Sequence, residues 1–128
     1  TNYKNLVTVL EVLFLRGERG NKKEMLAKRI ALLLGNSDLD IQNIYAKVKS
    51  IYVDRSDAVH DGITTNITRN SLDELRNLIR DIGRKYIVHI QNALTSNQNL
   101  TFVEAKNDMI NNLMHQVTSK IAAGVLPQ

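Results

Sequence analysis

Apolar residues recur every three to four positions along most of this chain, which is the period of amphipathic helices packed on a core. Polar or glycine-containing stretches interrupt that pattern at 17–20, 35–38, 62–70 and 95–100. The segments between them predict five helices, at about 3–16, 21–34, 40–60, 71–94 and 101–121. No segment alternates like a strand, and short connections favour antiparallel neighbours. The predicted fold is therefore an all-α, antiparallel bundle of about five helices, in a single domain covering residues 1–128.

Each predicted helix has one face that should point inward. The inward positions are Leu6, Val9, Leu10, Leu13 and Phe14; Met25, Leu26, Arg29, Ile30 and Leu33; Ile41, Ile44, Tyr45, Val48, Ile51 and Tyr52; Leu75, Leu78, Ile79, Ile82, Tyr86 and Ile90; and Phe102, Met109, Ile110, Leu113, Val117 and Ile121. Three helix starts also carry a capping pattern, in which Asn, Ser or Thr is followed three residues later by Glu. These starts are Asn21–Glu24, Ser71–Glu74 and Thr101–Glu104.

The inward stripe of the third predicted helix continues onto Arg55, where a core or interface residue would be expected. An arginine is rarely buried without a partner. A carboxylate of this chain, a second subunit or a bound phosphate would satisfy its guanidinium. From spacing alone, a structural arginine and a functional arginine fit equally well. Arg29 lies in a similar place on the second helix, where an ion pair with Glu11 is one way to satisfy it.

His60 follows Arg55 by five residues, about 140° further around an ideal helix. Gly62 is a common kind of helix stop, so His60 is expected in the last helical turn. From there its imidazole either caps the helix or shares a site with the long Arg55 side chain. Ser56, four residues before His60, is on the same helical face. Asp57 is either a solvated acid or a group that orients its neighbours.

Composition narrows the chemistry further. The chain has 128 residues, 43% of them apolar, which suffices for one core. With no cysteine, disulfides, thiol nucleophiles and cysteine-based zinc sites are excluded. The net charge of +4 is compatible with a polyanionic partner. Arg69, Arg76 and Arg80 fall near one helical face, although most such charge runs are simply solvated.

The sequence gives little support for a metal site or for a membrane-spanning segment. His60, His89 and His115 are scattered and show no metal-ligand spacing, and there is no glycine-rich phosphate loop. The apolar run at 30–34 is far too short to span a membrane. Because the chain opens at Thr1 without a methionine, we expect it to be a fragment of a larger protein.

Residues 51–62 read Ile-Tyr-Val-Asp-Arg-Ser-Asp-Ala-Val-His-Asp-Gly. This segment resembles the signature of the HEPN superfamily, an Arg followed four to six residues later by His. It is more narrowly similar to the Apea-like branch, whose pattern is Leu-Tyr-x-x-Arg-Ser-x-x-Val-His-Gly. Asp61 is the one clear departure, because the branch usually has Gly directly after His. Segments 10–15 and 26–35 also resemble that branch, and the likeness covers about residues 6–120.

The resemblance implies a helical bundle, commonly dimeric, in which two Arg/His motifs face each other. Many HEPN proteins are metal-independent endoribonucleases of toxin–antitoxin, abortive-infection or CRISPR-associated defence systems. Others are non-catalytic RNA-binding or scaffold modules, so both functions stay open. The implied partners are RNA, a second copy of the chain, and an antitoxin or adjoining domains. No cofactor, metal or membrane is implied, and the expected location is the cytoplasm.

The resemblance also assigns roles to residues. His60 would act as the general acid or base, since its charge changes near neutral pH. Arg55 would hold the phosphate and its developing charge. Ser56 or Asp57 would orient one of these groups. Tyr52 and Arg69 are the residues expected to bind substrate.

Overall fold

The computed structural model consists of five α-helices in the part of the chain that it describes. They are α1 (Tyr3–Phe14), α2 (Lys22–Leu34), α3 (Asp38–His60), α4 (Arg69–Ser96) and α5 (Phe102–Ala122). The structure describes residues 3–60, 62 and 67–128, with only the backbone for 57–60. The predicted all-α bundle is confirmed, and each helix boundary lies within a few residues of its predicted place.

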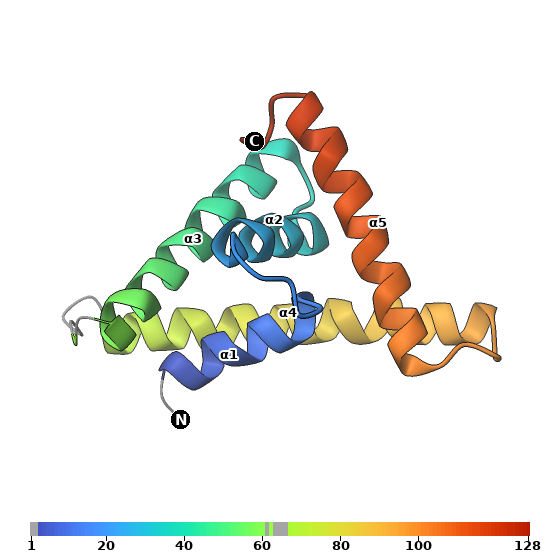
Figure 1. Cartoon of the computed structure of the whole chain (residues 1–128), viewed down its shortest axis with the longest axis horizontal. Helices are drawn as coiled ribbons and strands as arrows, with labels where there is room; N and C mark the ends of the chain where they lie inside the picture. Colours follow the sequence, from blue (N-terminus) through green and yellow to red (C-terminus); the bar gives the residue numbers. More distant parts are fainter. Residues whose placement is uncertain (1–2, 61, 63–66) are drawn as a thin grey trace.

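The helices α3, α4 and α5 form three sides of a triangle when viewed as in Figure 1. The helix α2 is seen nearly end-on inside this triangle, and α1 lies along α4. Contacts join α2 to all four other helices. The core is therefore arranged around α2.

The central position of α2 follows from its sequence. All eight residues from Leu26 to Leu33 are buried, so apolar side chains surround the helix rather than forming one stripe. A helix that is apolar on every side belongs in the interior. Lys28 and Arg29 are the exceptions, because both are buried although both are charged.

The inward faces of the other helices agree well with the predicted stripes. On α3 and α4 the predicted positions are all buried or partly buried. Phe14 of α1 meets Tyr86 of α4 edge to face, with ring centroids 5.8 Å apart. The Tyr86 hydroxyl donates a 2.9 Å hydrogen bond to the Leu13 carbonyl, so this buried polar group is satisfied.

Two inward predictions were wrong. Val9 is 44% exposed, because α1 turns Val7 and Leu10 into the core instead. Phe102 is 57% exposed, because it is the first residue of α5 and lies beyond the buried stretch that begins at Ala105. An apolar residue at the end of a helix can satisfy the periodicity without reaching the core.

The three predicted caps had different outcomes. Thr101 forms the predicted capping box with Glu104. The predicted box at Ser71 was wrong, because α4 begins earlier and Thr68 caps it, with Ser71 in the position expected for Glu74. Asn21 is the N-cap position of α2, as predicted, but it forms no capping box. Its φ of 54° is left-handed, and its side chain makes no capping hydrogen bond.

We predict opposite effects for two glycine-to-alanine substitutions. A Cβ on Gly35 would lie 2.7 Å from the Ala31 carbonyl oxygen and even closer to Ile41 Cγ1. Gly35→Ala should therefore lower the free energy of unfolding by about 1–3 kcal/mol, because the added methyl group overpacks this site. A Cβ on Gly83 would meet nothing within 4 Å. Gly83→Ala should therefore raise the free energy of unfolding by about 0.5–1 kcal/mol, because alanine favours a helix interior more than glycine does. Urea unfolding measures both changes in the free energy of unfolding. Changes of the same sign in the two variants would contradict this packing.

Among the described residues, no helix has the length and apolar character needed to cross a lipid bilayer.

Candidate functional site

In the C-terminal half of α3, Tyr52 and Arg55 both contact Glu11 of α1. Arg55 Nη2 lies 3.7 Å from Glu11 Oε1, a loose ion pair. The Tyr52 hydroxyl donates a 3.3 Å hydrogen bond to the other carboxylate oxygen of Glu11. The Arg55 guanidinium carbon is also 5.8 Å from the centroid of the Tyr52 ring, within cation–π range. Glu11 therefore holds both motif side chains against α1.

The guanidinium of Arg55 is only partly satisfied by these contacts. Its side chain is 22% exposed, and its Nε is buried with no hydrogen-bond partner among the described residues. A guanidinium carries five N–H donors, and a buried donor without an acceptor costs free energy. Of the three partners considered from sequence, a carboxylate of this chain is present. The contact leaves the buried Nε of Arg55 without an acceptor in the described part of the chain.

Burial raises the pKa of Tyr52, and the neighbouring Glu11 carboxylate raises it further against the opposing effect of Arg55. The phenol therefore stays protonated at neutral pH. In this state it can donate a hydrogen bond or stack, but it cannot serve as a base.

A groove of about 460 Å³ lies beside these residues, on the side where the turn before α2 meets α3. Tyr52, Val53 and Ser56 line it from α3, and Lys22 and Lys23 line it from the first turn of α2. The N-terminal end of a helix also carries partial positive charge. The groove therefore combines two lysines, a helix N-terminus, a hydroxyl and an aromatic ring, which is an environment suited to a phosphorylated ligand.

The structure brings together some of the predicted site residues. Tyr52 and Ser56 share the groove, and Arg55 lies between them on the same helix. Arg69 is the first residue of α4, is exposed, and does not line this groove. The side chains of Asp57 and His60 lie outside the described residues. The helix α3 ends at His60 as predicted.

Two features of the backbone and the groove bear on the sequence prediction. Gly62 has a φ of +66°, in the left-handed region expected of a glycine helix stop. Lys22 and Lys23 were missed from sequence, because they reach the motif only when the turn before α2 packs against α3. No local signal marks that long-range contact.

The suggested ion pair between Arg29 and Glu11 was wrong. Arg29 Nη2 lies 2.7 Å from Glu18 Oε2, and its Nη1 donates a 2.7 Å hydrogen bond to the Phe14 carbonyl. Glu11 is instead occupied by Arg55 and Tyr52. The side chain of Arg29 is only 4% exposed, so it is a structural cation that ties the turn after α1 to α2.

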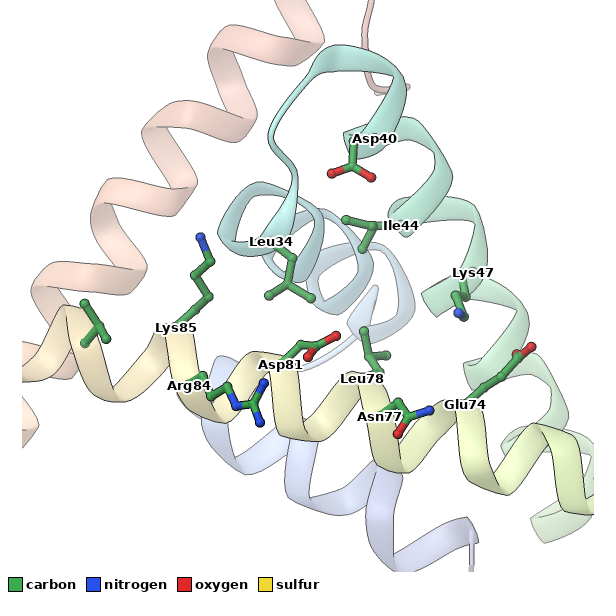
Figure 2. A pocket seen from close by; sticks show the side chains of 11 residues that line it. Leu34, Asp40, Ile44, Lys47, Glu74, Asn77, Leu78, Asp81, Arg84 and Lys85 are labelled. Carbon is green, nitrogen blue, oxygen red and sulfur yellow. The ribbon is translucent and has the colours of Figure 1, made fainter.

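A larger cavity of about 690 Å³ lies between the end of α2, α3 and α4, away from the motif. Figure 2 shows Leu34, Ile44 and Leu78 among charged side chains of both signs. The charged side chains are Asp40, Lys47, Glu74, Asp81, Arg84 and Lys85. Its three carboxylates would oppose an anionic ligand. For phosphate chemistry, the smaller and more cationic groove is the better candidate.

No cluster of three or more metal-binding side chains occurs in the described parts of the chain. No family model, curated protein or solved structure matches this chain. The motif residues and the groove beside them are therefore the features from which a function can be inferred.

Proposed function

We propose that this protein is a metal-independent endoribonuclease of a defence or toxin type, as the resemblance to Apea-like HEPN proteins implies. The observation that supports the proposal best is the cationic groove beside the motif. There Tyr52 and Ser56 face Lys22 and Lys23, and the Nε of the adjacent Arg55 has no partner among the described residues. A phosphodiester is the ligand that this combination of groups would recognise.

The proposed reaction uses the nucleophile that RNA already carries. The 2′ oxygen attacks the adjacent phosphorus, the bond from phosphorus to the 5′ oxygen breaks, and a 2′,3′-cyclic phosphate and a 5′-hydroxyl result. One proton leaves the 2′-hydroxyl and one proton reaches the departing oxygen. His60 carries out proton transfer, and Arg55 stabilises the charge that develops on the phosphoryl oxygens. Ser56 or Asp57 orients these groups.

The groove residues would hold the strand on which this reaction takes place. Lys22 and Lys23 would pair with a flanking phosphate, and the Tyr52 ring would contact a base or sugar. Glu11 would keep Arg55 and Tyr52 in place, at the cost of part of the positive charge of Arg55. Arg55 would therefore be held in position for phosphate binding, but Glu11 would weaken its attraction for the phosphate.

A second copy of the chain would complete the acid–base chemistry. One His60 supplies one proton-transfer group, whereas the reaction removes one proton and delivers another. In a two-fold dimer through the motif-bearing region, two His60 side chains would divide these tasks. We propose that the protein acts in the cytoplasm as such a homodimer, and that an antitoxin or adjoining domains control it.

The test is cleavage of single-stranded RNA in EDTA by the wild type, Arg55→Ala and His60→Ala. The wild type should cut, and both variants should lose most of the activity while still folding by circular dichroism. Unchanged cleavage by both variants would overturn the assignment.

The alternative function is a non-catalytic RNA-binding or dimerisation module. The Glu11 contact favours this reading, since it occupies part of the guanidinium that a nuclease would use. A wild type that binds RNA in EDTA but never cuts it, alone or in its longer natural context, would establish the alternative.

A further inference from the structure

The outer face of α4 carries a row of four arginines: Arg69, Arg76, Arg80 and Arg84. At 100° per residue, all four lie within about 80° of one another around the helix, and they span about 22 Å along its axis. All four side chains are exposed. They form a line of positive charge, called here the arginine row.

Negative charge opposes this row at its C-terminal end, where Arg84 also lines the cavity between α2, α3 and α4 with Asp40, Glu74 and Asp81. Asp73 lies within it and approaches Arg76 at 3.7 Å, but both side chains are about half exposed, so the pair is weak. Arg80 donates a 3.3 Å hydrogen bond to the neutral Asn77. Arg69 and Arg84 form no ion pair within the described ranges. On the neighbouring α1 the acid is Glu11, which Arg55 and Tyr52 occupy.

An apolar pocket of about 440 Å³ borders the same stretch of α4. Gly83 and Ile87 line it, and these residues follow Arg80 and Arg84 by three positions, which makes them neighbours on the helix surface. Tyr86 and Ile90 also line it, and Phe102 contributes a ring that is 57% exposed at the start of α5. Arginines and an accessible aromatic ring thus lie next to one another.

We propose that this surface binds single-stranded RNA, with backbone phosphates on the arginine row and one unpaired base in the apolar pocket against Phe102. Cationic tracks beside stacking aromatics are how proteins hold single strands without reading sequence. An acidic peptide could also place an aromatic ring in this pocket, so the competition experiment below separates the two ligands. A duplex is disfavoured because its bases are already stacked.

This inference rests on the proposed function for its choice of RNA. It gives the substrate a second contact surface, away from the groove beside the motif. In such an arrangement α4 captures the strand, and the motif region cuts it. Arg69 would then bind substrate through the arginine row and not through the groove.

The experiment measures binding of a fluorescent single-stranded RNA by anisotropy over a range of salt concentrations. Each arginine that contacts a phosphate adds about 0.7 to the slope of log K against log salt on a single strand. The variant Arg80→Gln/Arg84→Gln should therefore lower that slope by about 1.4. Phe102→Leu should weaken binding by about 5- to 100-fold with an unchanged slope, since it removes stacking but no charge.

Two matched controls make the result specific. Lys85→Gln removes the same charge from another face of α4, and Val103→Ala shortens an exposed apolar residue that does not line the pocket. Both should bind like the wild type. Slopes or affinities that change equally in the controls and in the test variants would overturn the inference, as would an acidic peptide that competes as well as RNA.

The outcome is separable from that of the nuclease proposal. If RNA binding depends on the arginine row and Phe102 but no RNA is cut, this surface is correct and the nuclease is wrong. If RNA is cut at Arg55 and His60 while the α4 and Phe102 variants bind it normally, this surface is wrong and the nuclease stands.

Discussion

Replacement of Arg29 by alanine should destabilise the fold by about 3 kcal/mol, near the lower end of what the loss of one partner from a buried pair costs. Arg29 is only 4% exposed, whereas its partner Glu18 is 27% exposed and keeps some contact with water. The substitution leaves the Phe14 carbonyl without its donor and the Glu18 carboxylate without its cation. It also opens space between α1 and α2. Urea unfolding measures the difference.

Arg16→Ala is the matched control, because Arg16 belongs to the same turn but is exposed. Its guanidinium donates a 2.9 Å hydrogen bond to Asn111. Loss of an exposed contact of this kind should cost about 1 kcal/mol or less. Equal losses in the two variants would show that Arg29 is not the anchor of this turn.

Acidic pH should weaken the ion pair between Arg29 and Glu18. Partial burial raises the pKa of Glu18, but hydrogen bonds from the Arg29 side chain and the Arg16 backbone outweigh it and hold the pKa below 4.5. A depressed carboxyl pKa contributes stability that is present above the unfolded value and lost as pH falls through the folded value. Below about pH 4.5 the wild type should therefore lose stability, and Glu18→Gln should remove this part of the pH dependence.

Replacement of His60 by alanine should lower the rate of RNA cleavage by about 10²- to 10⁴-fold, which is the usual contribution of a general acid or base. RNA binding should change far less, because in the proposed complex Lys22, Lys23 and Arg55 supply most of the charge that attracts the phosphates. Single-turnover cleavage at saturating RNA separates these two effects.

The other histidines of the chain provide the controls for that experiment. His89 and His115 are both exposed and lie on α4 and α5, away from the motif. His89→Ala and His115→Ala should cleave at the rate of the wild type. A comparable loss in either control would argue that the effect of His60→Ala comes from the fold and not from proton transfer.

The sequence predicted the helices well because helical periodicity is a local property. The stripes of α3 and α4, the end of α3 at His60 and the Thr101 cap all depend on residues within a few positions of one another. The errors occurred where tertiary contacts decide. Val9 fits the period of α1 as well as Val7 does, and only the packing of α1 shows which of them is buried.

The candidate site was predicted only in part for the same reason. Tyr52, Arg55 and Ser56 could be named from one helix, but their partners come from distant positions. Glu11 is 41 residues from Tyr52 along the chain, and it was assigned to the wrong arginine. Lys22 was not considered, because its place in the groove depends on how the turn between α1 and α2 folds against α3.

In the proposed mechanism, the 2′-hydroxyl of RNA is the nucleophile in a metal-independent cleavage at the Arg55/His60 motif. The most direct test of this mechanism is the product pattern from an RNA oligonucleotide with a single 2′-deoxy nucleotide at a linkage that the wild type cuts, measured in EDTA. We expect cleavage at this linkage to disappear while cleavage at the other linkages continues. Cleavage that persists at the deoxy linkage at the normal rate would contradict this mechanism.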